Sequence, residues 1–398
     1  MIEQIIIRDG DMQSPHRAAP ARPKEAIRKA YSTNPDAEGA AQELYESLAD
    51  TRAAVIMFFC CVEYELEILS RSISRLFGDT PVVGCTTAGE ISPAGYVQNS
   101  ITAFSLPADS FQVESRLVVN LQNFSPESAH ELVDGMLSDL TEREVAPVMD
   151  HSFALTLLDG MSIREEIVMN SLSSALNGIQ LVGGSAGDNL HFRDTHVYFD
   201  HHFHSNAAVL MLVNTSCPFR IFSDHHLAQG QEKLVVTEAD PFRRIVREFN
   251  AEPAALEYCR ITGLKLEDLD NRAFALNPLA VQIGDEVYIR SIQQVNEDLS
   301  LTFFCAIDQG IVLTGMYSTG LVTHTHNMLK LIGEELGHPE LVIGYDCIHR
   351  RIEMEEYDLL PAISELYKQH NVIGFSTYGE QFNDLHINHT FTGVMLGS

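Results

Sequence analysis

Apolar and polar positions along this chain follow two periods, one typical of helices and one typical of strands. Apolar residues recur every three or four positions over residues 37–49 and 66–76, which predicts two amphipathic helices. A continuous apolar run over residues 53–61 predicts a buried strand. Residues 100–106 and 112–119 alternate with period two, as strands do. The predicted fold class is α/β, as two modules of mixed, largely antiparallel sheets packed with helices.

The same order of elements returns further along the chain. A chain of 398 residues is too long for one hydrophobic core, so two or three domains are expected. Further helices are predicted over residues 126–140, 165–176, 240–249, 252–262, 324–336 and 358–367, and a short one around 24–31. The predicted domains are a loosely ordered, proline-rich lead-in at residues 1–36, an N-terminal domain at 37–240 and a C-terminal domain at 241–398.

Three apolar, strand-like runs end in a glycine turn that contains a small hydroxyl residue and closes on an acid. The turns span residues 84–90, 183–188 and 374–380, and their acids are Glu90, Asp188 and Glu380. Glycine allows a positive φ or a close backbone approach, and Ser or Thr satisfies turn amides locally. Three copies indicate a repeated strand–turn–strand device. The three carboxylates converge if the turns meet in space; otherwise each caps its own turn.

Net charge and cysteine use narrow the classes of function. A formal net charge of -29 opposes binding to nucleic-acid phosphate or to an anionic membrane surface. The seven cysteines include no C-x-x-C pair, and several lie inside apolar runs, which predicts buried, reduced thiols. The apolar run at residues 53–62 is too short to span a bilayer. We therefore expect a cytoplasmic protein with neither a nucleic acid nor a membrane as partner.

Residues 183–187 match G-x-S-x-G, the nucleophile elbow of α/β-hydrolases, with Ser185 at its centre. That device needs a helix directly after the serine, and strand-like sequence follows here instead. A structural turn is therefore favoured over a catalytic serine, and no catalytic residue is predicted.

Histidines supply the other candidate chemistry. Those between residues 191 and 204 resemble a polar loop more than a metal site, although His202 and His204 would share one face of a strand. The pair His225–His226 lies between an aromatic strand and an apolar one, so at least one of the two is expected beside a core. On a strand after the third turn, His386 shares a face with Asn388 and Thr390, which fits either a pocket wall or an exposed strand face.

Residues 84–96, 181–188 and 374–397 together resemble the FIST family of bacterial sensory proteins, in both its N-terminal and C-terminal modules. Within that family, residues 220–237, 252–258 and 375–391 are similar to NosP-type nitric-oxide sensors. The resemblance implies a non-covalent b-type haem that binds nitric oxide. It also implies signalling to a separate sensor histidine kinase, within two-component and cyclic-di-GMP control.

The resemblance also ranks the candidate haem ligands. No C-x-x-C-H occurs, so covalent haem attachment is excluded. His226 and His225 rank first because they lie in the NosP-like stretch, with His226 as the expected iron ligand. His386 belongs to the general family pattern and ranks second. A haem-free sensor of a small metabolite such as an amino acid is the alternative, and a homo-oligomer remains open.

Overall fold

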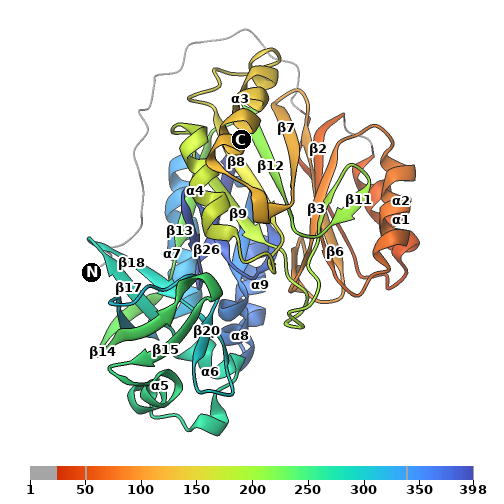
Figure 1. The fold of residues 1–398 in the computed structure, drawn as a ribbon. Helices are drawn as coiled ribbons and strands as arrows, with labels where there is room; N and C mark the ends of the chain where they lie inside the picture. The colour runs from red at the N-terminus through yellow and green to blue at the C-terminus, as the bar shows by residue number, and fades with distance from the viewer. Residues whose placement is uncertain (1–24, 50–51, 338, 398) are drawn as a thin grey trace.

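The computed structural model describes residues 25–49, 52–337 and 339–397 (Figure 1). Its body contains three repeats of one unit, in which two strand–helix pairs precede a parallel strand, a short hairpin and a last antiparallel strand. The first repeat comprises β1 (Arg28–Ser32), α1 (Ala37–Leu48), β2 (Ala53–Cys61), α2 (Leu66–Phe77), β3 (Val82–Thr87), the hairpin β4 (Glu90–Ser92) and β5 (Gly95–Val97), and β6 (Ile101–Pro107).

The other two repeats follow the same order. The second comprises β7 (Phe111–Val119), α3 (Pro126–Thr141), β8 (Ser152–Leu158), α4 (Glu165–Leu176), β9 (Leu181–Ser185), the hairpin β10 (Val197–Phe199) and β11 (His202–His204), and β12 (Ala207–Thr215). The third comprises β13 (Phe219–Asp224), α7 (Leu321–Leu336), β22 (Pro339–Cys347), α8 (Ile348–Glu356), α9 (Leu360–Gln369), β23 (Val372–Thr377), the hairpin β24 (Glu380–Phe382) and β25 (Leu385–Ile387), and β26 (Phe391–Gly397).

The hairpin of each repeat pairs with the parallel strand of another repeat. The hairpin of the second repeat pairs with β3, that of the third with β9, and that of the first with β23. Three six-stranded sheets result, in the orders β1-β6-β2-β3-β10-β11, β7-β12-β8-β9-β24-β25 and β13-β26-β22-β23-β4-β5. In each sheet one parallel pair lies among antiparallel neighbours. The predicted α/β class with mixed, largely antiparallel sheets is confirmed.

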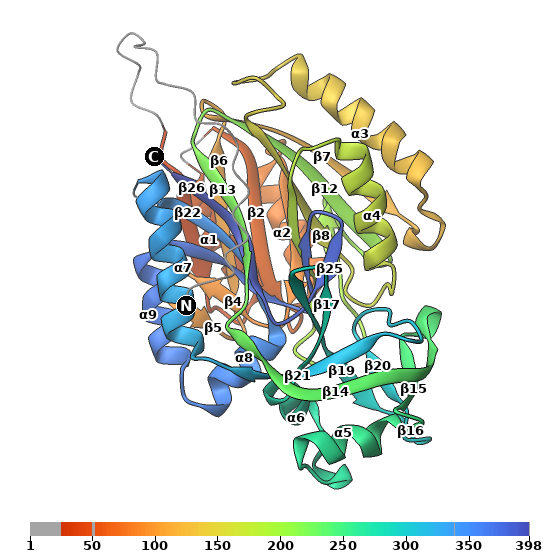
Figure 2. The same cartoon turned by 90° about the vertical axis from the view of Figure 1, so that its left-hand side faces the viewer.

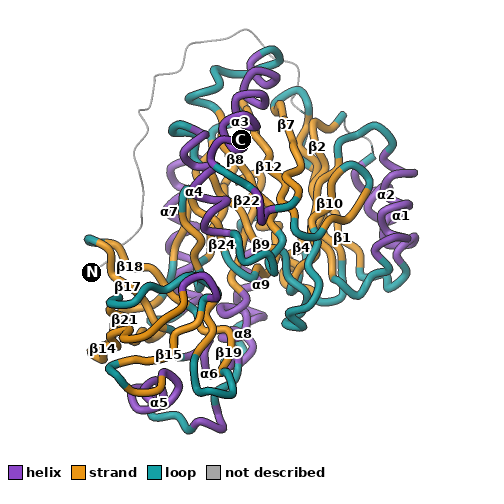
Figure 3. Tube along the Cα trace, viewed as in Figure 1, coloured by secondary structure: helices purple, strands orange, loops and turns teal. Residues whose placement is uncertain are grey.

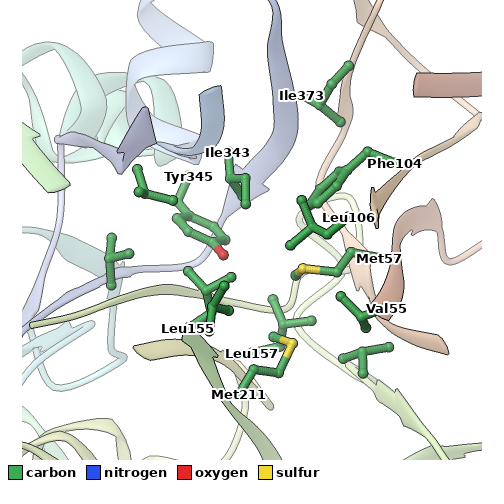
Figure 4. Packing of buried hydrophobic residues seen from close by; sticks show 14 of the residues in the cluster. Val55, Met57, Phe104, Leu106, Leu155, Leu157, Met211, Ile343, Tyr345 and Ile373 are labelled. Carbon is green, nitrogen blue, oxygen red and sulfur yellow. The ribbon is translucent and has the colours of Figure 1, made fainter. Parts of the chain in front are cut away.

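One hydrophobic core lies between the inner faces of the three sheets. Figure 4 shows side chains from all three pointing toward one another, among them Met57, Leu155 and Tyr345, and these three are fully buried. Each large apolar side chain removed from water stabilises the fold by roughly 1.5–3 kcal/mol. Helices cover the outer faces: α1 and α2 pack on the first sheet, α3 and α4 on the second, and α7 and α9 on the third.

An inserted domain separates β13 from α7 in the third repeat. It contains β14 (Leu227–Asp240), β15 (Ile245–Phe249), β16 (Glu252–Pro253), α5 (Ala254–Thr262), α6 (Asn271–Leu276), β17 (Leu279–Ile283), β18 (Glu286–Arg290), β19 (Ile292–Val295), β20 (Leu301–Phe303) and β21 (Val312–Ser318). Figures 1 and 2 show it below the three sheets, and Figure 3 shows that it combines strands with the helices α5 and α6 and with loops. Its two connections to the body are adjacent, since Thr319 N–H donates to His226 O at 3.0 Å.

Two predicted helices are strands in the structure. Residues 28–32 form β1, an edge strand paired with β6, so the predicted lead-in joins the fold from residue 28, while its residues 1–24 lie outside the described residues. Over residues 240–249, Pro241 opens only a 3₁₀ turn that ends at Arg244, where φ is 57°. Pairing with β14 and β20 then makes residues 245–249 a strand, because a sheet ladder overrides local helix propensity. The predicted helix at 252–262 is confirmed as α5.

Candidate ligand-binding site

A cavity of about 900 Å³ lies where the second repeat, the third repeat and the inserted domain meet. Its walls come from the loop between α4 and β9, strand β13, the hairpin β24–β25 and strand β18. This volume lies within the range of pockets that enclose small organic ligands, roughly 300–1,000 Å³. The cavity is therefore the candidate ligand-binding site.

The repeat architecture explains why the cavity is here. A smaller cavity of about 290 Å³ lies between the first and second repeats, and equivalent parts enclose it. Those parts are the loop between α2 and β3, the hairpin β10–β11 and strand β7. The larger cavity has one further wall, residues 286–289 of the inserted domain. The insertion thus enlarges a space that the repeat itself creates.

The cavity wall combines apolar and charged side chains. Its apolar members come from β13, β18 and the hairpin β24–β25: Ile221, Val287, Ile289, Phe382, Leu385 and Ile387. Its charged members are Arg220, Asp224, Glu286 and Asp384. Asp224 is nearly buried, and its Oδ2 lies 2.8 Å from His324 Nε2 on α7. Such a wall suits a small ligand that has both apolar and polar groups.

His225 lies on the cavity wall, with Ile221 and Ser223 on the same face of the chain. Burial lowers the pKa of His225 to about 4, so the imidazole is neutral near pH 7. Its Nδ1 accepts a hydrogen bond from Leu227 N–H at 3.3 Å, which places the ring proton on Nε2. Of the three predicted ligand histidines, His225 lines this cavity.

His226 faces the opposite way, into a buried ionic network. Arg350 Nη1 lies 3.1 Å from its Nδ1, and Glu353 Oε2 lies 2.7 Å from its Nε2. Because an arginine only donates, Nδ1 accepts and Nε2 carries the proton that Glu353 accepts. The ring is fully buried. Both nitrogens are therefore occupied, and this arrangement does not fit the prediction that His226 binds haem iron.

His386 does not line the cavity. Strand β25 ends at Ile387, and the following turn has φ +56° at His389, so strict alternation does not continue to Thr390. Thr390 faces the cavity, whereas the His386 ring packs on Gly379, where an added Cβ would lie 2.1 Å from its Cε1. Burial lowers the pKa of His386. Of the two interpretations, the pocket wall holds for Thr390 alone, and the exposed strand face is wrong, because His386, Asn388 and Thr390 are all buried.

The three glycine turns do meet, through hydrogen bonds that run from repeat to repeat. Gly187 N–H donates to Thr86 O at 3.0 Å, Ala88 N–H to Ser376 O at 3.1 Å, and Ser185 N–H to Gly379 O at 2.9 Å. Glu90 and Glu380 nevertheless bond to neighbours near their own turns, and only Asp188 also accepts from another turn, through the Tyr378 hydroxyl. The turns are therefore the junction of the three sheets, and their acids do not form a common site.

Glu90 and Glu380 occupy equivalent, fully buried positions. Each accepts from the threonine three residues before it, and from the backbone and hydroxyl groups of the residue ten positions after it, Ser100 or Thr390. Burial raises the pKa of Glu90 to about 7 and that of Glu380 to about 8. Asp188 differs, because it accepts from the N–H groups of residues 192–194 and from the Tyr378 hydroxyl.

Ser185 lacks the geometry of a nucleophile elbow. It ends β9, is fully buried, and its Oγ accepts from Gln381 Nε2 at 2.8 Å. No helix lies among residues 186–196, all of which are described, so the helix that would complete an elbow is missing.

The histidines at residues 191–204 bond mainly to their own loop. His202 Nδ1 lies 2.8 Å from Asp200 O, and His204 Nε2 lies 3.1 Å from Phe199 O. Among the described residues, no group of three or more His, Cys, Asp or Glu side chains is placed to hold a metal ion.

A buried ionic network around Arg350 is the main feature that sequence patterns did not indicate. Arg350 Nε donates to Asp346 Oδ1 at 2.6 Å, and Asp346 Oδ2 accepts from Tyr96 and Tyr367 at 2.7 and 2.6 Å. Through His226 and Glu353 the network continues to Ser318 of the inserted domain. It joins the first repeat's hairpin, the third repeat and the insertion.

Two family models match the chain, and the boundary between them falls inside the inserted domain. One described as the FIST N domain matches residues 54–252, and one described as the FIST C domain matches residues 254–383. The chain belongs to the FIST family, whose domains indicate a role in sensory signalling. A search of curated proteins gives no match. Among the described residues, no helix is both long and apolar enough to cross a membrane.

Proposed function

We propose that this protein is a cytoplasmic sensor that binds a small ligand in the 900 Å³ cavity and signals to a separate protein partner. The observation that carries the proposal is the composition of that cavity, whose walls come from two repeats and from the inserted domain. A ligand there contacts all three parts at once. Its binding energy therefore favours one arrangement of the insertion over others. The proposed role is binding, without catalysis.

The specific ligand that we propose first is nitric oxide, which would bind to a non-covalent b-type haem held by His225. His225 offers a neutral imidazole on the wall. To hold iron through Nε2, the ring must release the Leu227 N–H group, so that its proton moves from Nε2 to Nδ1. The neighbouring apolar side chains suit a macrocycle. Arg220 is the cation on the wall, and it already pairs with Glu335 at 3.5 Å, whereas Asp224, Glu286 and Asp384 oppose a propionate. The wall thus fits the iron and the ring better than it fits the propionates. When bound, haem iron supplies the coordination site for nitric oxide.

Absorption spectroscopy tests the haem proposal directly. The full chain is mixed with hemin, reduced, and scanned with and without nitric oxide, alongside His225→Ala, His226→Ala and His386→Ala. We expect a Soret band that shifts with nitric oxide and is lost in His225→Ala. His386→Ala should retain the band, because His386 lies outside the cavity. A protein-bound band, distinct from that of free hemin, that survives His225→Ala removes His225 as the ligand, and a spectrum of the unaltered protein identical to that of free hemin removes haem.

A haem-free metabolite sensor is the second candidate, and the carboxylates of the cavity favour it. Three acidic side chains and one arginine on a partly apolar wall suit a small zwitterion, such as an amino acid, better than a dianionic porphyrin. Thermal denaturation against the common amino acids tests this candidate. A ligand that raises Tm in the unaltered protein but not in Asp224→Asn supports it.

The partner that we propose is a sensor histidine kinase. The test is kinase autophosphorylation in the presence of the ligand-bound and the ligand-free protein. A difference between the two states supports this partner, and equal rates at saturating protein exclude it. Analytical ultracentrifugation of each state establishes whether a homo-oligomer forms.

A further inference from the structure

A chain of hydroxyl groups joins the cavity to the buried carboxyl group of Glu380. Ser223, on the cavity wall, has its Oγ 2.9 Å from Thr392 Oγ1. Thr392 Oγ1 lies 2.9 Å from Thr390 Oγ1, which in turn donates to Glu380 Oε2 at 2.8 Å. Thr392 and Glu380 are fully buried. The chain therefore joins Ser223 on the wall to the buried carboxyl group through Thr392. Thr390 also lines the cavity, but its hydroxyl bonds to both Glu380 and Thr392, so its one proton is used within the chain whichever way the bonds run.

The ionised form of Glu380 fixes the direction of every hydrogen bond in this chain. A hydroxyl group has one proton to donate. If Thr390 donates to the carboxylate, Thr392 must donate to Thr390, and Ser223 must donate to Thr392. Ser223 then has only lone pairs to offer, so the cavity wall presents a hydrogen-bond acceptor.

Protonation of Glu380 allows the opposite direction. A proton on Oε2 can be donated to Thr390, which frees the hydroxyl proton of each following residue and leaves that of Ser223 for a ligand. Burial raises the pKa of Glu380 to about 8; the hydrogen bonds from Thr377 and Thr390 lower this pKa, and the nearby charge of Asp346 raises it. The thiol of Cys347 on β22 also faces this carboxyl group, and burial keeps the pKa of that thiol well above its usual range. The carboxyl group thus exchanges its proton near neutral pH, while the thiol stays protonated.

The first repeat contains the same carboxyl device without the connection to a cavity. Glu90 accepts from Thr87 and Ser100 as Glu380 accepts from Thr377 and Thr390. The next hydroxyl on that strand, Thr102, donates to Ala30 O at 3.2 Å, so the first copy ends inside the protein. Glu90 is therefore a matched internal control.

We propose that Glu380 is a positioning residue that sets, through Thr390 and Thr392, whether Ser223 offers the ligand an acceptor or a donor. The inference rests on the proposed function, because it requires that the cavity binds a ligand. A ligand that places an N–H group at Ser223 binds the protein with Glu380 ionised. One that places a carboxylate there binds with Glu380 protonated, and so takes up a proton.

The test uses benzamidine and benzoate, two probes of similar shape that present a cationic donor and an anionic acceptor. Their affinities for the full chain are measured by calorimetry from pH 6 to pH 9. Below pH 8, benzamidine affinity should rise about tenfold per pH unit, because only the ionised fraction binds it. Benzoate affinity should fall above pH 8. Glu380→Gln should abolish both dependences, and Glu90→Gln should leave them unchanged.

Ser223→Ala is a second variant that breaks the chain at the cavity while leaving the partners of Glu380 in place. It should also abolish both pH dependences, and it covers the case in which Glu380→Gln fails to fold. If the probes bind but the dependences persist in these variants, or vanish in Glu90→Gln, the positioning role is refuted. If neither probe binds at any pH, the proposed cavity function fails, and the inference fails with it.

Discussion

Removal of the Asp346 carboxylate should destabilise the protein more than the loss of any exposed ion pair. Arg350 and Asp346 are about 1% and 0% exposed, and Asp346 accepts hydrogen bonds from Arg350 and from two tyrosines. In Asp346→Ala the guanidinium group remains buried without its counter-charge. Breaking a buried pair in this way costs about 3–5 kcal/mol. That is a large part of the 5–15 kcal/mol that typically separates folded from unfolded states.

Urea denaturation followed by far-UV circular dichroism measures this effect, because the chain has no tryptophan for fluorescence. Lys265→Ala is the matched control, since Lys265 and Glu267 are about 75% exposed and such pairs are worth less than about 1 kcal/mol. Replacing both members, as Asp346→Leu with Arg350→Met, should recover only part of the loss, because the Tyr96 and Tyr367 hydroxyls and His226 Nδ1 then lose their partners. A loss below about 1 kcal/mol in Asp346→Ala would refute the view that the network holds the three parts together.

Three further predictions follow from other contacts. Gly374→Ala should lower the free energy of unfolding, measured by urea denaturation, by about 1–3 kcal/mol or more, because its Cβ would lie 1.7 Å from Gly344 O. Gly333→Ala is the control: it has open space inside helix α7, so it should leave the free energy of unfolding unchanged or raise it. Because burial raises the pKa of Glu90 to about 7, the folded state binds more protons than the unfolded state between about pH 4.5 and 7. The free energy of unfolding should therefore fall across that interval, and Glu90→Gln should flatten the fall. Glu166 of α4 accepts hydrogen bonds from the Arg244 side chain and from the Ala306 N–H group, both of the inserted domain. Arg244→Gln should therefore speed hydrogen exchange at the Ala306 amide. Unchanged exchange would show that the Arg244–Glu166 contact does not hold the inserted domain in place.

Local sequence signals predicted the elements of the repeats, but not their partners. The three glycine turns indicated a repeated device, and each does mark the end of a parallel strand. The exchange of hairpins was not predictable, because a short hairpin presents similar backbone groups to any free sheet edge. The prediction of a helix at 240–249 was wrong because pairing with β14 and β20, which local sequence does not reveal, makes residues 245–249 a strand.

The candidate site was predicted in part. His225 lines the cavity, whereas its neighbour His226 faces the interior, as successive residues of an extended chain do. The polar sequence of α8 suggests an exposed helix, yet His349, Arg350 and Glu353 are buried in it. Only the three-dimensional packing of Asp346 and His226 against this helix makes that burial favourable. Local patterns in a single sequence do not show which distant residues pack against this helix.

The exchange of hairpins has a consequence for how the chain folds. The edge of the second sheet is completed by residues 380–382, about 200 positions after the β9 strand that they join, and the third sheet needs residues 90–92 from the first repeat. Contacts this distant in sequence slow folding, because a long loop must close before they form. During synthesis on the ribosome, the edge of β9 stays unpaired until residues 380–382 of the last repeat have emerged. Chaperone demand during synthesis should therefore be high, and expression of residues 54–252 alone should give an aggregation-prone fragment.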